Sequence, residues 1–328
     1  MSGPAYLGVH SYYSFLAGTA SPGQIADAAA SHGAEAVALT DTDGMFAVVP
    51  FCRACQKRGI RPVIGTELTG GSRRVTLLAR NMNGYSEISR LVTARRLEED
   101  FSLAGSLMEA SDNIYILSAD PGILEMLRGK RYLRAALPLS DGTAGRRERY
   151  RLRSLAEGLG LRRVAAGPVF FMDRRDYHIH RLLRAIGAGK TVGTLSAGDT
   201  ASRHSFLHSP EELSRIFPDG ILDETSEVAA DCSLELDLES RRLPAFPLPE
   251  GSESSALLER LALEGLEKRG LNNSRGRKQL EHELSVVNSK GLADYFLICR
   301  DVVSFAARRG MRSLGRGSAG NSLLSHVL

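Results

Sequence analysis

Polar side chains that could perform chemistry stand at the ends of the first three apolar runs of the chain. His10 ends the run at residues 6–10, and Asp41 and Glu67 follow the runs at 36–40 and 61–66. If these runs are parallel strands, the three side chains share one edge of a sheet, where active sites of β/α proteins gather. Their positions make them candidates for a functional site.

A second candidate is a loop of small residues near residue 320, Gly315-Arg-Gly-Ser-Ala-Gly-Asn-Ser322, which runs directly into a helical pattern. Such a loop can bring backbone N–H groups and a helix amino terminus to phosphate oxygens. Arg316 adds a cation and Ser318 a hydroxyl. The loop therefore suits a nucleotide-phosphate site, and an ordinary turn before a helix is the alternative.

Basic residues cluster just before and within this loop, at Arg308, Arg309, Arg312 and Arg316. They could contact a DNA backbone or a triphosphate. A solvated helix end is the alternative interpretation, and the sequence leaves both open.

Two further pairs have the spacing of ligands. Cys52 and Cys55 form a Cys-x-x-Cys pair, but they fall inside a predicted helix without a second pair, which favours helix packing over metal or redox chemistry. His178 and His180 are two residues apart at a predicted helix start, where such side chains point in different directions. Neither pair is predicted to bind a metal.

The elements that must position these residues alternate between strands and helices. Strands are predicted at 6–10, 36–40, 61–66, 75–80, 114–118 and 163–170, with helices at 22–32, 45–58, 85–97, 146–159 and 175–186. This alternation predicts parallel strands with crossover helices, either as a barrel or as an open sheet. Ser209-Pro-Glu-Glu is a helix start, and a second helix is predicted at 223–232.

Beyond this region we predict a Pro-rich linker at 243–253, LPAFPLPEGSE, and then helices at 254–269, 277–289 and 295–311. The predicted organisation is a first domain over 1–242, the linker, and a helical segment over 254–328. Hydrophobic residues make up 43% and charged residues 24% of the 328, with a net charge of +4, which is ordinary for a globular protein. The chain shows no signal-peptide pattern and no apolar run long enough for a membrane helix, so we expect a cytoplasmic protein.

The segment at 282–328, with YFLI at 295–298 followed by GRGSAGNS at 315–322, resembles the opening of the palm domain of bacterial C-family DNA polymerases. The front of the chain resembles the PHP domain of that family, through VHSYYSFLAGT at 9–19, ALTDTDGMFA at 38–47, PVIGTELT at 62–69 and LLARNMNGY at 77–85. The resemblance implies a distorted parallel β/α barrel related to metal-dependent phosphoesterases, followed by a mainly helical partial palm.

The chain departs from the phosphoesterase pattern at most of the positions where the resemblance places metal ligands. Those positions hold Gly8, Ala17, Thr42, Arg74, Pro168 and Phe170, and Asp120 stands roughly where a Cys is expected. Only His10 and Glu67 remain as remnant ligands, with Asp41 beside them. A multinuclear site needs several converging carboxylates and imidazoles. We therefore predict a catalytically dead scaffold in which these three residues satisfy backbone groups.

The resemblance also implies that Gly315, Arg316, Gly317 and Ser318 handle the phosphates of an incoming nucleotide. The metal-binding palm acids of the family lie beyond this loop, so we expect a truncated start of the palm, unable to polymerise alone and poorly packed after residue 251. The full-length parent would use DNA, deoxynucleoside triphosphates and Mg²⁺, and other replication or repair subunits are conceivable partners. Asn321 and residues 14–22 lean towards the error-prone branch over the replicative one. A free-standing PHP-type phosphoesterase and a non-catalytic replication or repair binding module are the alternatives.

Overall fold

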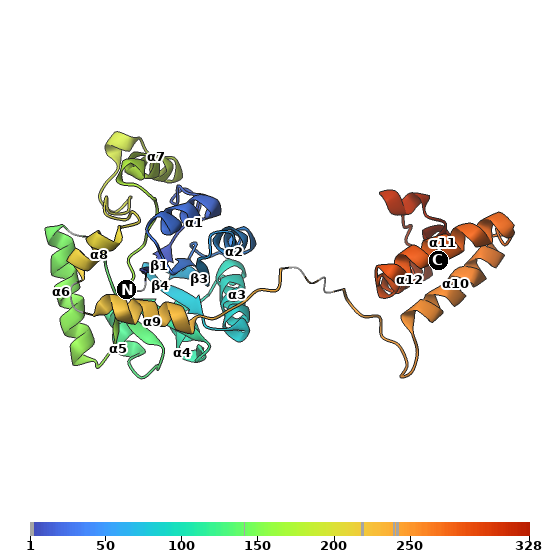
Figure 1. Cartoon of the computed structure of the whole chain (residues 1–328), viewed down its shortest axis with the longest axis horizontal. Coiled ribbons are helices and arrows are strands. Elements are labelled where there is room, and N and C mark those ends of the chain that lie inside the picture. Colours follow the sequence, from blue (N-terminus) through green and yellow to red (C-terminus); the bar gives the residue numbers. More distant parts are fainter. Residues whose placement is uncertain (1–2, 141, 218–219, 239, 241–242) are drawn as a thin grey trace. The chain divides into compact units, whose positions relative to one another are not determined.

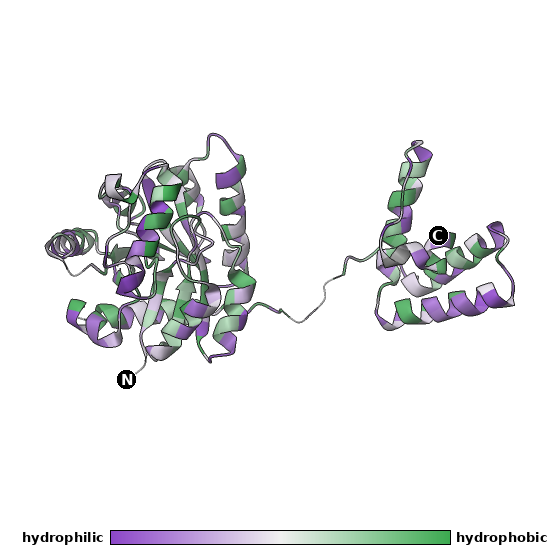
Figure 2. Cartoon of the chain, turned by 90° about the horizontal axis from the view of Figure 1, so that it is seen from above, coloured by the Kyte–Doolittle hydropathy of each residue, from purple (hydrophilic) through white to green (hydrophobic). Residues whose placement is uncertain are grey.

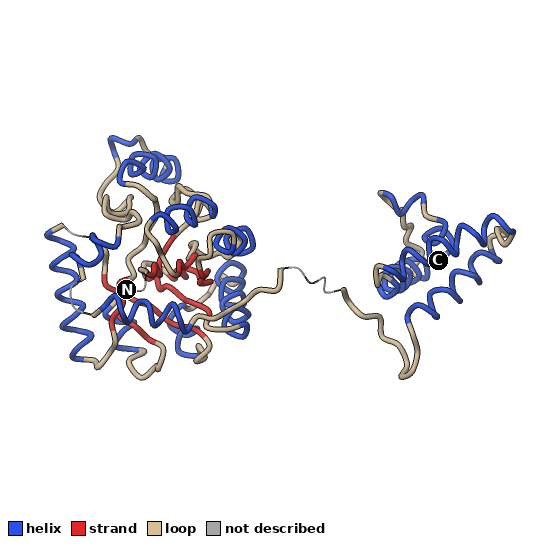
Figure 3. The backbone as a smooth tube through the Cα atoms, in the orientation of Figure 1, coloured by secondary structure: helices blue, strands red, loops and turns tan. Residues whose placement is uncertain are grey.

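The computed structural model describes residues 3–140, 142–217, 220–238, 240 and 243–328. The chain divides into two units, Met1–Leu238 and Glu239–Leu328 (Figure 1). All of the strands in the described residues lie in the first unit, whereas the second consists of helices and loops (Figure 3).

The first unit is built on a seven-stranded sheet whose strands follow one another in chain order. β1 pairs in parallel with β2 and β2 with β3, and likewise β5 with β6 and β6 with β7. β4 is antiparallel to both of its neighbours. The strands are β1 (Ala5–Val9), β2 (Ala36–Leu39), β3 (Arg61–Gly70), β4 (Arg73–Ala79), β5 (Ile114–Ser118), β6 (Leu133–Leu137) and β7 (Arg163–Ala165).

The sheet curls into a nearly closed barrel because its first strand meets the segment that follows its last. Val9 and Val169 form a parallel bridge. The His10 N–H donates to Val169 O at 2.8 Å, and the Val169 N–H donates to Gly8 O at 2.8 Å. The structure therefore decides for a barrel over an open sheet.

Helices surround this barrel and cover the outer faces of its strands (Figure 1). Ser209 caps α8 through a capping box with Glu212, as its sequence predicts. The helices of the unit are α1 (Pro22–Ser31), α2 (Val48–Gln56), α3 (Met82–Leu97), α4 (Leu103–Glu109), α5 (Pro121–Met126), α6 (Thr143–Gly158), α7 (Tyr177–Ala188), α8 (Pro210–Ile216) and α9 (Ile221–Asp231), with short 3-10 turns at Arg174–Asp176 and Val192–Thr194.

Alternation along the strands divides the buried residues between two cores. One set packs with α9 and fills the barrel interior: Ala5, Leu7, Ala36, Ala38, Val63, Leu78, Tyr115, Leu117, Ala136, Val164, Val228, Ala229 and Cys232. Their neighbours along the strands, such as Val37, Leu39 and Ile116, pack outward against the helices. α9 contacts β1, β2 and β7, and so it spans the seam where the barrel closes.

The structure corrects the predicted topology at β4. Strand–helix alternation predicted parallel strands throughout, but β3 and β4 form an antiparallel hairpin. Only residues 71 and 72 separate these strands, and Gly71 has a positive φ of 60°, which suits a tight turn. A parallel crossover needs a much longer connection.

The strand β6 and the helices α4 and α5 are elements that sequence analysis missed. β6 reads Leu-Arg-Ala-Ala-Leu, and Arg and Ala carry little strand propensity. Arg134 is nevertheless buried, because its guanidinium pairs with the buried carboxylate of Glu224 on α9 at 2.6 Å. This partner lies far away in sequence, so no local pattern signals the strand.

The second unit has a hydrophobic core of its own, so the expectation of poor packing after residue 251 was wrong. The helices are α10 (Ser254–Lys268), α11 (Ser274–Ser289), α12 (Ala293–Arg308) and α13 (Leu323–Val327). They are amphipathic, with hydrophobic and hydrophilic residues side by side (Figure 2). Their buried residues include Leu258, Ala262, Leu266, Leu280, Leu284, Val287, Leu297, Leu324 and Val327. The second half of α12, in contrast, exposes Val302, Val303 and Phe305.

No helix among the described residues is both long and apolar enough to cross a membrane.

A close approach of backbones holds α13 on α10 and generates a prediction. A Cβ atom added to Gly265 would lie 1.9 Å from the carbonyl oxygen of Val327. We expect Gly265→Ala to destabilise the second unit by about 1–3 kcal/mol, because the helices must separate, and this cost outweighs the roughly 1 kcal/mol that Ala gains in helix propensity. Hydrogen exchange of the α10 and α13 amides measures the change.

Gly158→Ala serves as the matched control, because Gly158 is a helical glycine with open space around its Cβ position. We expect that variant to be unchanged or stabilised by up to about 1 kcal/mol. Equal protection of α13 in wild type and Gly265→Ala would contradict the predicted contact.

Candidate functional site

A cavity of about 460 Å³ lies at the mouth of the barrel, where the carboxyl ends of β1, β2, β3, β6 and β7 meet the start of β4. It brings together the positions where a PHP-like pattern would place metal ligands, since Ala17, Thr42, Arg74, Pro168 and Phe170 all line it. The sequence motifs thus converge on one place, although the residues in them no longer provide ligand atoms.

Asp41 is a loop anchor at this mouth. Its carboxylate accepts hydrogen bonds from the Ser11 N–H, the Ser11 hydroxyl and the Ser14 hydroxyl, each at 2.7 Å. The side chain is fully buried, and both of its oxygens are engaged. A buried carboxylate needs such donors, and here they also order the loop after β1. Asp41 thus holds one backbone N–H and two serine hydroxyls, whereas the sequence analysis expected it to satisfy backbone groups.

His10 lies next to this anchor and contacts Ser14, Thr42 and Phe170. Its Nδ1 is 3.0 Å from Ser14 Oγ, and its ring stacks on Phe170 with centroids 4.3 Å apart. The Ser14 hydroxyl proton goes to Asp41, so we assign the imidazole proton to Nδ1. Burial lowers the pKa of His10, while the charges of Glu67 and Asp41 act in the opposite direction. His10 is therefore a neutral, stacked imidazole.

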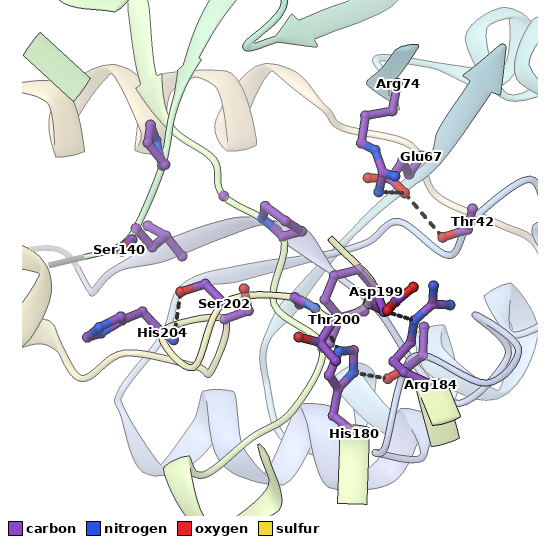
Figure 4. A pocket seen from close by; sticks show the side chains of 18 of the residues that line it. Thr42, Glu67, Arg74, Ser140, His180, Arg184, Asp199, Thr200, Ser202 and His204 are labelled. Atoms are coloured by element: carbon purple, nitrogen blue, oxygen red, sulfur yellow. Dashed lines mark hydrogen bonds and ion pairs between the residues drawn. The ribbon is translucent and has the colours of Figure 1, made fainter. Parts of the chain in front are cut away.

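Glu67 is the second buried carboxylate of the mouth, and an arginine neutralises it. Arg74 Nη1 lies 3.4 Å from Glu67 Oε1, and the Thr42 hydroxyl lies 3.3 Å from the same oxygen. Glu67 lies between these two residues at the edge of the cavity (Figure 4). Arg74 stands where the family resemblance places a histidine ligand. A guanidinium thus provides the positive charge that the carboxylate requires in a buried position.

This donor set does not fit a multinuclear metal centre. Both carboxylate oxygens of Asp41 accept hydrogen bonds from Ser11 and Ser14. His10 and Glu67 are therefore the remaining candidate metal ligands. No group of three or more His, Cys, Asp or Glu side chains in the described part of the chain is arranged to hold a metal ion. Closely spaced cations need several converging anionic or imidazole ligands. The cavity therefore lacks, among the described residues, the converging ligands that such a centre needs.

His180 joins two loops across the mouth, a role that sequence analysis missed. Its Nδ1 lies 2.7 Å from Ala17 O, and its Nε2 accepts a hydrogen bond from the Ala201 N–H at 3.0 Å. Burial lowers its pKa. His178, two residues earlier, is exposed and contacts the carbonyl oxygen of Arg175. Only the tertiary contacts with residues 17 and 201 distinguish the two imidazoles.

Cys52 and Cys55 are packing residues of α2. Both side chains are buried and free of disulfides. Burial raises the pKa of Cys52 to about 11 and that of Cys55 to about 12. Both are therefore thiols at neutral pH, whereas a thiolate is the form that binds metals and attacks disulfides.

The glycine-rich loop lies in the second unit and is exposed. Gly315, Arg316 and Gly317 are open to solvent, and Gly317 has a positive φ of 75°. Ser318 begins a 3-10 turn, Ser318–Asn321, and the structure does not describe its side chain. Arg308, Arg309 and Arg312 are exposed as well, and the guanidinium of Arg309 lies 4.6 Å from the ring centre of Phe305.

The helix that follows this loop, α13, already has a carboxylate at its amino terminus. The carboxylate of Glu283 on α11 accepts hydrogen bonds from the Leu323 and Leu324 N–H groups, at 3.1 and 2.9 Å, and from the Ser322 hydroxyl at 2.7 Å. These are the amides that the sequence pattern offered to a phosphate. The carboxylate takes that place at the amino terminus of α13.

Comparison with known proteins finds two family matches in this chain. Residues 7–137 match the PHP domain model, and residues 256–328 match the model of the bacterial DNA polymerase III alpha NTPase domain. A solved two-domain protein from Bacteroides vulgatus that contains a predicted PHP-like metal-dependent phosphoesterase is 14% identical, covers 58% of this chain and 56% of its own, and has a TM-score of 0.40.

Similarity to curated proteins covers nearly the whole chain. An error-prone DNA polymerase from Symbiobacterium thermophilum is 33% identical over 98% of the chain, and the DNA polymerase III subunit alpha of Bacillus subtilis is 29% identical over 98%. The matches take in 34% and 32% of those relatives, so the chain spans about a third of their length.

The fold of the first unit is a PHP-type β/α barrel, and no group of three or more His, Cys, Asp or Glu side chains among its described residues is arranged to hold a metal ion. The chain belongs to the family of bacterial DNA polymerase III alpha subunits and error-prone DNA polymerases.

The neutral state of His180 predicts a pH-dependent contribution to stability. Below its ordinary pKa of about 6.5, the unfolded chain takes up a proton that the buried imidazole resists, so stability falls as the pH drops through that value. We expect His180→Ala to cost about 2–4 kcal/mol at neutral pH, through lost packing and hydrogen bonds. Because the wild type alone carries the protonation cost, the difference should shrink in acid. Urea unfolding at pH 7.5 and at about 5.5 measures it.

His282→Ala provides the control, because His282 is exposed on α11 in the second unit. We expect little loss of stability there and the same value at both pH values. A cost of His180→Ala that does not change with pH would show that the imidazole is not held neutral.

Proposed function

We propose that this chain is the amino-terminal part of a DNA-directed DNA polymerase that acts in cytoplasmic replication or in error-prone repair synthesis. Its barrel serves as a catalytically inactive scaffold. Support comes from two matched segments in one chain, residues 7–137 and 256–328, and from the similarity to an error-prone DNA polymerase over 98% of the chain. DNA and deoxynucleoside triphosphates are the proposed substrates, and Mg²⁺ is the proposed metal of the complete polymerase.

The observation that carries the scaffold assignment is the internal neutralisation of the barrel mouth. Asp41 is saturated by serine donors and Glu67 is paired with Arg74, so the acids that a phosphoesterase would use for metals stabilise the fold instead. This arrangement argues against the alternative of a free-standing phosphoesterase. It leaves the barrel as a rigid body to which other parts of a polymerase can attach.

In the second unit we propose that Gly315, Arg316, Gly317 and Ser318 bind nucleotide phosphates, and that Arg308, Arg309 and Arg312 contact the DNA backbone. The loop is exposed and carries a guanidinium that forms no hydrogen bond or ion pair with the described residues. Because Glu283 occupies the amino terminus of α13, the loop and its arginine, rather than the helix, would make these contacts. A guanidinium can offer two parallel N–H donors to phosphate oxygens.

The scaffold assignment predicts that metals neither bind to nor stabilise the barrel. We expect EDTA to leave the thermal midpoint of the chain unchanged, because a metal stabilises a protein only by binding the folded state. Elemental analysis after dialysis against Zn²⁺ or Mn²⁺ should return substoichiometric metal. Glu67→Gln should have the same metal content as the wild type. A multinuclear metal complement, lost in Glu67→Gln, would overturn the assignment.

The polymerase assignment predicts that Arg316 determines nucleotide affinity. In the complete polymerase, we expect Arg316→Ala to raise the KM for deoxynucleoside triphosphates about tenfold in primer extension, since a charge-assisted hydrogen bond contributes about 1.5–3 kcal/mol. Arg275→Ala, at the exposed start of α11, removes the same charge elsewhere on the unit and should leave the KM unchanged. Equal KM values for both variants would exclude the loop, and an absence of primer extension by the complete protein would exclude polymerase activity.

A further inference from the structure

A second cavity lies at the other end of the barrel from the mouth. Its volume is about 640 Å³, and its lining comes from the starts of β5, β6 and β7, the end of the antiparallel β4, and the end of α9. The lining is unusually basic, with Arg80, Arg128, Lys130, Arg131, Arg134 and Arg162. Nothing in the activity proposed above uses this cavity.

Three of these cations form the wall of the cavity and are balanced by acids of α9. Arg134 pairs with Glu224 at 2.6 Å, and Arg162 contacts both Glu224 and Glu227. Arg80 binds Asp231 through two hydrogen bonds, at 2.8 and 3.1 Å. These pairs fix the wall in place, and their charges cancel one for one.

The other three cations lie on the connection between α5 and β6 and are not balanced. Arg128 and Arg131 are exposed, and neither forms an ion pair or hydrogen bond with a described side chain. The Lys130 ammonium donates to the carbonyl oxygen of Ala110 and forms no ion pair with a described residue, which leaves its charge in place. The cavity therefore carries an excess of positive charge at its rim, on a short connection held by a rigid wall.

Aromatic rings stiffen the floor beneath this rim. Tyr115 and Tyr132 meet edge to face, with centroids 5.1 Å apart. The guanidinium of Arg80 lies 3.8 Å from the centre of the Tyr132 ring, and that of Arg131 lies 5.3 Å from it. Cation–π contacts of this kind hold guanidinium groups in fixed directions. Of the three rim cations, Arg131 is thus positioned by an aromatic ring.

We propose that this cavity binds phosphate oxygens of a single-stranded nucleic acid. Guanidinium groups match the geometry of phosphate, and a positively charged groove that follows the backbone is a common part of single-strand binding sites. A recess of this volume is in the range that holds small ligands. A flexible single strand can place a few of its atoms in such a recess, whereas the backbone of a stiff duplex cannot bend into it. The proposal depends on the charge and shape of the cavity, and it holds whether or not the chain is part of a polymerase.

The test uses the whole chain and a fluorescein-labelled oligothymidylate, with anisotropy measured between about 50 and 200 mM salt. Arg128→Ala with Arg131→Ala removes the two exposed cations. Loss of two phosphate contacts should lower the slope of log K against log salt by about 1.4, because each contact to a single strand contributes about 0.7. The affinity at the lowest salt should fall about tenfold.

The matched control is Arg53→Ala with Arg90→Ala, which removes two exposed arginines from the outer helices α2 and α3 and changes the net charge equally. We expect it to keep the wild-type slope. Equal slopes for both double variants would overturn the proposal. Pyrophosphate binding is measured with the same variants. If Arg128→Ala with Arg131→Ala loses pyrophosphate binding but keeps oligothymidylate binding, the cavity binds small anions instead, and the proposal is overturned. Arg312→Ala with Arg316→Ala measures the contribution of the second unit separately, so that failure of one site does not conceal the other.

Discussion

Closure of the barrel between β1 and Val169 is the constraint on which the first unit depends. The two backbone hydrogen bonds between Val169 and the segment Gly8–His10 place His10 beside Phe170, which lines the mouth. Asp41 and the serines of the loop after β1 then order the rim, and His180 joins that loop to residue 201. A closed sheet has no free edge between its first and last strands, so these segments have little freedom to move apart.

The two ends of the barrel solve the problem of buried charge in different ways. At the mouth, each acid has its own neutral or cationic donors, and little charge is left to attract a ligand. At the opposite end, the acids of α9 neutralise the buried arginines, but the connection before β6 adds three cations without partners of opposite charge in the described chain. The excess positive charge that could attract an anion therefore lies at the end of the barrel away from the mouth.

The second unit shows how a small helical assembly can be packed without a large core. Gly265 lets the backbone of α13 approach α10, and Glu283 satisfies the first amides of α13. A five-residue helix has little stability of its own, so these tertiary contacts hold it. The exposed Val302, Val303 and Phe305 on α12 remain outside this core.

Local patterns in the sequence were enough to predict most of the strands and helices and the capped start of α8. They also predicted that Cys52 and Cys55 pack within a helix, and they show which residues stand at the mouth in place of metal ligands. These features follow from periodicity, capping and residue type, which act over a few positions. Tertiary structure alone decided the direction of β4, the existence of β6, the pairing of Arg74 with Glu67, and the capture of α13 by Glu283. Each of these depends on a partner distant in sequence or on a turn too short for a crossover, and burial is what makes such a partner necessary. The basic cavity before β6 was invisible for the same reason, because its residues come from five elements that only the closed barrel brings together.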